Sequence, residues 1–108
     1  MPELPRRFTI LYAPITKQHL RTIEPKYYSL IRSTIEQQLT FEPTIETRNR
    51  KPLKRPVLFM ATWEIRFGPQ NHFRVYYDVD LEQHLVSILA IGYKQGSRVV
   101  IGGEEIQL

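Results

Sequence analysis

Apolar and polar residues alternate between Trp63 and Tyr77, and this alternation predicts a β-hairpin. If Pro69-Gln70-Asn71 is a three-residue loop, Arg66 lies opposite Arg74 and every large apolar side chain falls on one face. A four-residue loop would scatter the apolar residues over both faces, so the odd loop gives the consistent register. The opposite face then carries the polar residues Glu64, Arg66, His72, Arg74 and Tyr76.

Two helices are predicted before this hairpin. The first runs from about Lys17 to Ile23 with Thr16 as its cap, and Pro25 suits the first turn of the second. The second helix spaces its apolar residues by three, four and four positions, which is the pattern of one buried stripe. The stripe consists of Tyr28, Ile31, Ile35 and Leu39.

Three further strands and one long loop complete the prediction. Residues 7–13 are rich in β-branched and aromatic types, residues 85–94 are mostly apolar, and residues 98–101 pair back as a short strand. Residues 40–61 contain three prolines among basic residues, so we expect a long connecting loop with a short extended piece at residues 57–60.

These elements predict an α+β fold in the order β-α-α-β-β-β. We expect a small, mainly antiparallel sheet of four or five strands with both helices packed on one face. A chain of 108 residues, 42% hydrophobic and 24% charged, fits a single domain over residues 1–108. It has no cysteine, which excludes disulfides and permits the cytoplasmic localisation that we expect. No segment approaches the roughly 18 apolar residues of a membrane span, so no membrane partner is expected.

The net charge of +4 is distributed unevenly along the chain. Residues 48–74 carry seven basic residues against Glu64 alone, a net +6, whereas residues 75–108 carry two basic and five acidic residues, a net −3. A concentrated basic segment attracts polyanions such as nucleic acid, although a loop that only keeps the protein soluble is the alternative. The candidate RNA-binding residues are Arg48, Arg50, Lys51, Lys54, Arg55 and, beside the hairpin loop, His72.

The polar face of the hairpin has the composition of a phosphate site. Two arginines opposite each other repel, and a fold tolerates them most easily where an anion lies between them. Metal-free RNA cleavage needs a base for the 2′-hydroxyl, an acid for the leaving oxygen and cations for the transition state. Lys94 completes a cationic ring if Ala90 and Gly92 share its face and leave room for a nucleotide. The catalytic candidates are therefore Glu64, Arg66, Arg74, Tyr76 and Lys94.

A simpler alternative is a solvated sheet face on which Glu64 pairs with one arginine. No cofactor or metal is expected, because His19, His72 and His84 are scattered without ligand spacing.

The order of elements and four segments also carry a resemblance to a known family. The chain resembles the RelE/ParE toxin superfamily of bacterial toxin–antitoxin modules, and within it the RelE-like small toxins. The resemblance covers nearly the whole chain from Pro25 on and implies a compact antiparallel sheet flanked by two N-terminal helices. The four segments are residues 63–68 (WEIRFG), 73–79 (FRVYYDV), 89–94 (LAIGYK) and 101–105 (IGGEE).

The resemblance implies cationic roles for Arg66, Arg74 and Lys94. The chain departs from RelE at two places: Glu64 stands where RelE has a second basic residue, and residues 100–101 are aliphatic where RelE has a base-stacking tyrosine. We therefore consider Tyr76 as a replacement stacking ring and Glu64 as a general base.

Many members of this family bind in the ribosomal A site and cleave mRNA there without a metal. The leading hypothesis is accordingly a ribosome-dependent mRNA endoribonuclease that inhibits translation. Its implied partners are a cognate antitoxin, mRNA and the ribosome. The alternatives are a ParE-like inhibitor of DNA gyrase and an inactive member that binds only RNA or its antitoxin.

Overall fold

The computed structural model describes residues 6–57 and 60–106, the side chains of residues 55–57 excepted. The predicted α+β class is confirmed, but the described residues form seven strands rather than four or five. No α-helix in these ranges is long and apolar enough to cross a membrane. The elements are β1 (Thr9–Tyr12), α1 (Thr16–Leu20), the 3-10 helix η1 (Pro25–Tyr27), α2 (Tyr28–Leu39), β2 (Arg50–Val57), β3 (Ala61–Phe67), the 3-10 helix η2 (Pro69–Asn71), β4 (Phe73–Asp80), β5 (Leu85–Gln95), β6 (Arg98–Ile101) and β7 (Glu104–Ile106).

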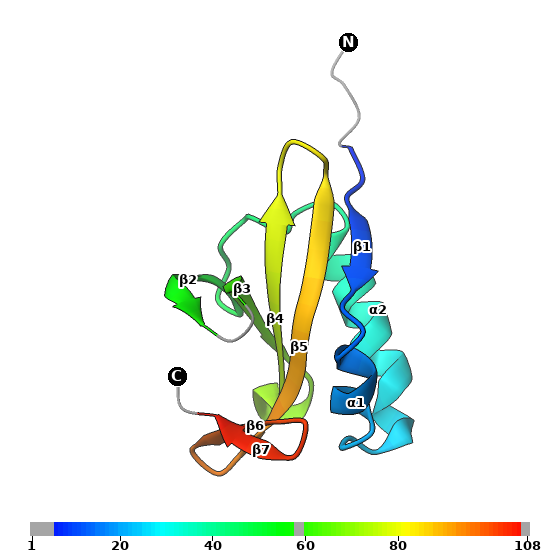
Figure 1. The fold of residues 1–108 in the computed structure, drawn as a ribbon, viewed down its shortest axis with the longest axis vertical. Helices are drawn as coiled ribbons and strands as arrows, with labels where there is room; N and C mark the ends of the chain where they lie inside the picture. Colours follow the sequence, from blue (N-terminus) through cyan, green and yellow to red (C-terminus); the bar gives the residue numbers. More distant parts are fainter. Residues whose placement is uncertain (1–5, 58–59, 107–108) are drawn as a thin grey trace.

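The strands form one curled sheet in the order β2-β3-β4-β5-β6-β7, in which neighbours are antiparallel (Figure 1). β1 pairs in parallel with the first half of β5, whereas β6 pairs with its second half. In Figure 1 the helices lie beside β1, and the β6–β7 hairpin turns away from them at the lower end of the sheet. The sheet therefore has a helix-covered face and an opposite face bounded by β2 and by the β6–β7 hairpin.

The main core lies on the helix-covered face. Ile31, Ile35 and Leu39 of α2 are buried, as the predicted stripe requires, and they belong to one cluster with buried residues of β3, β4 and β5. The first helix differs from its prediction, because Thr16 is inside α1 and its hydroxyl donates a hydrogen bond to the carbonyl of Ala13 (2.7 Å). Thr16 therefore does not cap the helix.

The β3–β4 hairpin has the predicted register. Arg66 pairs with Arg74, and the same alignment runs from Phe67↔Phe73 to Trp63↔Tyr77. Pro69, Gln70 and Asn71 form the single turn of η2, so the loop has the odd length that the alternation demanded. The large apolar side chains of both strands join the main core.

The prediction of a long loop over residues 40–61 is wrong. Residues 50–57 form β2, which pairs with β3 and has a register irregularity between Pro52 and Val57. Proline is tolerated here because β2 is an edge strand, which needs ladder hydrogen bonds on one side only. Of the predicted extended piece at residues 57–60, residues 58–59 lie outside the described residues.

Gly92 allows the sheet to curl tightly between β5 and β6. A Cβ at this position would lie 2.5 Å from the carbonyl oxygen of Val100 and 2.6 Å from Cγ1 of Ile101. Only a residue without a side chain permits this approach, and it brings β6 over the end of the sheet. The strand β7, which follows the Gly102-Gly103 turn, was not predicted.

Candidate functional site

The polar face of the hairpin continues across the neighbouring strands as two rows of paired residues. Directly paired residues point to the same side of a sheet, so each row shares one face. One row is Lys51–Glu64–Tyr76–Ala90, and the other is Arg66–Arg74–Gly92–Ile101. The structure thus brings together four of the five catalytic candidates, and we call Glu64, Arg66, Arg74 and Tyr76 the charged centre.

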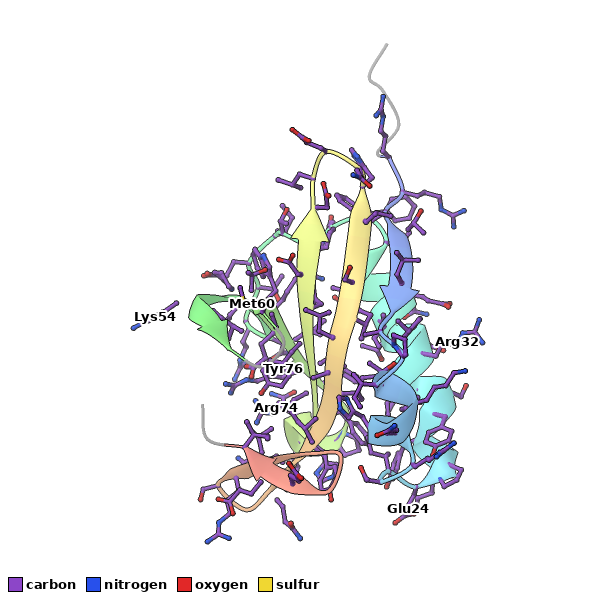
Figure 2. All side chains as sticks on the ribbon, viewed as in Figure 1. Glu24, Arg32, Lys54, Met60, Arg74 and Tyr76 are labelled. Atoms are coloured by element: carbon purple, nitrogen blue, oxygen red, sulfur yellow. The ribbon has the colours of Figure 1, made fainter. Side chains whose placement is uncertain are left out.

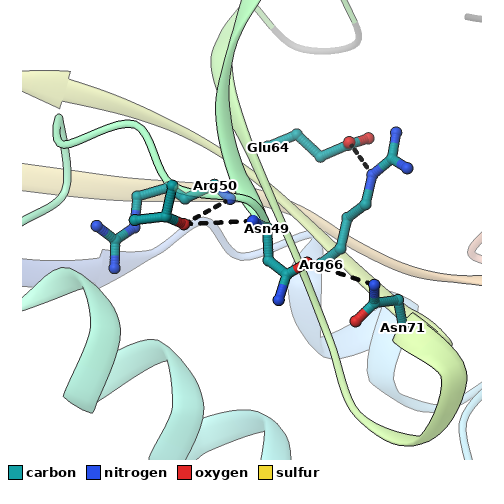
Figure 3. Close-up of polar contacts among 6 residues, drawn as sticks. Asn49, Arg50, Glu64, Arg66 and Asn71 are labelled. Carbon is teal, nitrogen blue, oxygen red and sulfur yellow. Dashed lines mark hydrogen bonds and ion pairs between the residues drawn. The ribbon is translucent and has the colours of Figure 1, made fainter.

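Glu64 already supplies an anion to the charged centre. Nε of Arg66 lies 2.7 Å from Oε1 of Glu64, and Figure 3 shows this ion pair on β3. The Glu64 side chain is only 8% exposed, whereas that of Arg66 is 49% exposed. The pairing of Glu64 with one arginine, considered above as the simpler alternative, is therefore present, but the face around Glu64 is buried rather than solvated.

Arg74 is the most enclosed cation of the charged centre. The residue is 5% exposed, and its buried Nε has no hydrogen-bond partner among the described residues. Burial and then the positive charge of Arg66 lower the pKa of Arg74, while the charge of Glu64 acts in the opposite direction. A guanidinium nevertheless stays protonated in proteins, so Arg74 holds an incompletely satisfied positive charge in a low-dielectric position.

Tyr76 does not have the exposed ring that base stacking requires. Its relative exposure is 0%, and it belongs to a second apolar cluster with Ala61, Ala90 and Ile101. In Figure 2, Arg74 and Tyr76 lie on the side of β4 away from the helices. Burial and then the charge of Glu64 raise the pKa of Tyr76, so its hydroxyl stays protonated. The idea of Tyr76 as a replacement stacking ring is therefore wrong for this conformation.

Lys94 lies on the expected face, but the expected space beside it is filled. Lys94 is exposed and pairs with Val99, which packs against the second apolar cluster. The side chain of Ile101 occupies the place above Gly92, and Ala90 is fully buried. The small residues therefore accommodate the chain's own β6 hairpin and not a nucleotide.

His72 is not part of the charged centre. It follows η2 directly, and its ring contacts the rings of Phe73 and Tyr93 at centroid distances of 5.0 and 5.7 Å. These two residues belong to the main core on the helix-covered face. The alternation failed at this residue because His72 has helical backbone angles (φ −65°, ψ −36°) and is not part of β4.

The basic run divides into structural and exposed residues. Arg50 is 2% exposed and donates hydrogen bonds to the carbonyl oxygens of Ile45 (2.9 Å) and Gln38 (3.1 Å) and to Oε1 of Gln38 (2.6 Å). Its assignment as an RNA-binding residue is therefore not supported by its position, since its side chain ties β2 to the end of α2. Arg48, Lys51 and Lys54 are exposed, and the side chain of Arg55 lies outside the described residues.

A short polar network positions the β3–β4 turn beside this run. The Arg66 backbone N–H donates to the carbonyl of Asn49 (2.8 Å), and Nδ2 of Asn71 donates to Oδ1 of Asn49 (3.4 Å, Figure 3). Sequence reasoning did not identify Asn49, and it also missed Tyr27 and Tyr93, which line a pocket with His72. The only available signal for Tyr93 was its place next to Lys94, on the opposite side of the same strand.

Comparison with known proteins supports the architecture. No family model matches the chain, and no curated protein matches it. Among solved structures, the chain is similar to a chain of the toxin–antitoxin complex RelBE2 from Mycobacterium tuberculosis, with a TM-score of 0.68 and 22% sequence identity. The match covers 86% of this chain and 98% of that one. The chain thus shares its fold with a chain of this toxin–antitoxin complex.

Proposed function

We propose that this protein is the toxin of a bacterial toxin–antitoxin module and that it cleaves mRNA on the ribosome without a metal. Two independent features support this proposal. The fold is similar to that of a chain in a solved toxin–antitoxin complex. The charged centre places two arginines across from each other on the sheet face that the helices leave uncovered.

The observation that carries the proposal is the state of Arg74. A buried guanidinium whose Nε has no partner is costly, and a charge-assisted hydrogen bond donated by Arg74 to an anionic ligand would reduce that cost. A phosphate presents several acceptor oxygens and the opposite charge. The scissile phosphate of RNA is therefore the ligand that best matches Arg74 together with the half-exposed Arg66.

The charged centre supplies the base and the cations of the cleavage reaction, and solvent supplies the acid. The 2′-oxygen would form a bond to phosphorus while the bond from phosphorus to the 5′-oxygen breaks, leaving a cyclic phosphate. Glu64 would take the proton of the 2′-hydroxyl, and the leaving 5′-oxygen would take a proton from solvent. Arg66 and Arg74, with Lys94 at the margin, would stabilise the charge of the transition state. Tyr76 would act as a positioning residue beneath them.

The exposed cations around β2 would hold the RNA without reading its sequence. Arg48, Lys51 and Lys54 are suited to phosphate contacts, which set the position of a nucleic acid but not its specificity. For Arg55, whose side chain lies outside the described residues, phosphate contact stays a prediction. The ribosome and mRNA are the proposed nucleic-acid partners, and a cognate antitoxin is the proposed protein partner.

The test compares two arginines that are each ion-paired to a glutamate of the same element, Arg66 to a buried glutamate and Arg32 to an exposed one. Arg66→Gln and Arg32→Gln each remove an exposed guanidinium that is ion-paired to a glutamate, at 2.7 Å for Arg66–Glu64 and 3.1 Å for Arg32–Glu36. Adding each protein to a translation extract and mapping mRNA 5′ ends should show cuts with the wild type and with Arg32→Gln. Arg66→Gln should lower the cleavage rate by about 10²–10³-fold, the loss typical of one transition-state contact.

Two observations favour a second function. The carboxylate of Glu64 neutralises one of the two positive charges of the arginine pair, and the buried ring of Tyr76 cannot stack on a base. In this second function, the protein would bind RNA or an antitoxin without cleaving RNA. Wild-type protein that yields no mRNA cuts but still binds RNA would establish this alternative. Expression that produces DNA damage with translation intact would instead indicate a ParE-like inhibitor of gyrase.

A further inference from the structure

A small aromatic pocket lies at the η2 end of the sheet, on the face opposite the charged centre. It has a volume of about 200 Å³, and its lining includes Glu24, Tyr27, His72, Phe73 and Tyr93. The His72 and Tyr93 rings are stacked at 26°, and the Tyr27 ring lies 5.1 Å from that of Phe73. We call this the aromatic pocket.

The backbone around the aromatic pocket is well anchored. The Lys94 N–H donates a hydrogen bond to the carbonyl of His72 (2.7 Å), which ties the residue after η2 to β5. Phe73 pairs directly with Tyr93, so the rings from β4 and β5 lie side by side. His72 is exposed, and Tyr27 and Tyr93 are half-buried, so ring surfaces remain open to a ligand.

The aromatic pocket and the cationic residues are adjacent in the chain. Successive residues of a strand point to opposite faces, so Phe73 lines the pocket while Arg74 belongs to the charged centre, and Tyr93 lines the pocket while Lys94 lies on the cationic side. A single nucleic-acid strand that contacts Arg74 and Lys94 can therefore pass around the η2 turn. A base further along that strand would then reach the rings.

The size and chemistry of the pocket fit one base. Pockets for drug-sized ligands measure about 300–1,000 Å³, so a pocket of about 200 Å³ takes a single ring system. Aromatic rings bind every base through its π-face, and the Glu24 carboxylate, which is ion-paired with Lys26, retains lone pairs that can accept a hydrogen bond from a base amino group. We propose that the aromatic pocket binds one unpaired nucleobase of the RNA whose phosphate contacts the charged centre, an inference that rests on the proposed function.

The experiment measures binding of a short single-stranded RNA, intact or with one abasic nucleotide at each position in turn. His72→Asn removes the ring from the pocket. His84→Asn is the matched control, because His84 also lies beside a turn and stacks on an aromatic ring, that of Phe8 at 4.7 Å, at the opposite end of β4 and β5. A third variant, His72→Phe, retains a stacking ring, and thermal unfolding verifies that every variant is folded.

His72→Asn should weaken binding of the intact RNA by about 5- to 100-fold, the range expected for loss of one stacked base, while His84→Asn and His72→Phe stay close to wild type. For the RNA that is abasic at the pocket position, His72→Asn should cause no further loss. The pocket proposal would be overturned if His72→Asn weakened binding of the intact and abasic RNAs equally, or if it weakened binding no more than His84→Asn does. In either case, a loss of cleavage with Arg66→Gln would still support the proposed function. If wild type binds no RNA, the pocket proposal fails, whereas the proposed function is decided by the mRNA cuts in the translation extract.

Discussion

Arg66 and Arg74 are directly opposed on neighbouring strands but have different surroundings. Arg66 is half-exposed and paired with Glu64, whereas Arg74 is buried and its Nε has no partner in the described part of the chain. The mutual repulsion of the two guanidiniums is offset by one carboxylate, not two. At the scale of single residues, this imbalance is the reason to expect an anionic ligand.

Two adjacent tyrosines on β4 differ in the hydrogen bonding of their hydroxyl groups, and this difference can be tested by the free energy of unfolding. Both are fully buried, but the Tyr77 hydroxyl donates to the carbonyl of Pro43 (2.6 Å) while the Tyr76 hydroxyl has no partner among the described residues. Tyr77→Phe should lower the free energy of unfolding by about 1–3 kcal/mol, because it leaves a buried carbonyl unsatisfied. Tyr76→Phe should leave the free energy of unfolding unchanged or raise it by about 1 kcal/mol, since the hydroxyl meets the geometry of no hydrogen bond among the described residues, and Glu64, which raises its pKa, is the nearest candidate acceptor.

Urea denaturation of the two phenylalanine variants measures both values. A loss above about 1 kcal/mol in Tyr76→Phe would mean that its hydroxyl has a hydrogen-bond partner, with Glu64 the first candidate. In that case Tyr76 would be a member of a satisfied polar network, and its proposed positioning role would have to include that bond.

At the scale of elements, hydrophobic periodicity predicted the helices and strands whose positions depend on burial of apolar side chains. The α2 stripe and the β3–β4 register follow from which side chains must be buried together, so Ile31, Ile35 and the Arg66–Arg74 pairing could be obtained from the sequence. β2 could not be predicted, because its prolines and basic residues have the composition of a loop, and an edge strand depends on hydrogen bonds that composition does not reveal.

The candidate site also has features that periodicity predicts and features that it does not. The face of Arg74 follows from alternation, but its burial does not. Gly92, the neighbour of Arg74 in its row, is covered by Ile101 of β6, and a partner that lies this far along the chain cannot be read from local alternation. His72 was placed on the wrong face since η2 gives it helical backbone angles, which interrupts the period of two. Periodicity thus fails where a turn begins and where a later segment folds over a strand.

Arg50 and Lys51 begin β2 side by side, and their different roles can be separated by the same substitution. Methionine keeps the aliphatic stem of either residue but removes its hydrogen-bond donors. Arg50→Met should lower the free energy of unfolding by at least about 2 kcal/mol, because it leaves the buried acceptors of Gln38 and Ile45 without their donor. Lys51→Met should change stability by less than about 0.5 kcal/mol, as Lys51 is exposed.

Thermal or urea unfolding of both methionine variants checks this assignment. If Arg50→Met were as stable as Lys51→Met, the hydrogen bonds from β2 to the end of α2 would contribute little. Arg50 would then return to the list of candidate RNA contacts.

At the scale of the whole molecule, the position of the charges matters more than their sum. On the helical side, Lys26 and Arg32 form ion pairs with Glu24 and Glu36. Around β2, Lys51 and Lys54 are exposed and form no ion pair within the described part of the chain. The net charge of +4 therefore understates the attraction of the β2 side for a polyanion.

This asymmetry gives a prediction for the salt dependence of RNA binding. Each phosphate contact to single-stranded nucleic acid contributes about 0.7 to the slope of log affinity against log salt concentration. Lys51→Gln combined with Lys54→Gln should therefore reduce that slope by about 1.4. Arg21→Gln combined with Arg32→Gln removes the same net charge from the helical side, and it should leave the slope unchanged because those residues lie away from β2.

Fluorescence titrations of one RNA oligonucleotide at several salt concentrations measure both slopes. Because the two double variants have the same net charge, a difference between their slopes can arise only from where the charges lie. Equal slopes would mean that RNA responds to the total charge of the protein, and the β2 side would then not be the RNA-binding surface. A reduced slope for the β2 variant alone would place the RNA backbone along β2, next to the arginine pair of β3 and β4.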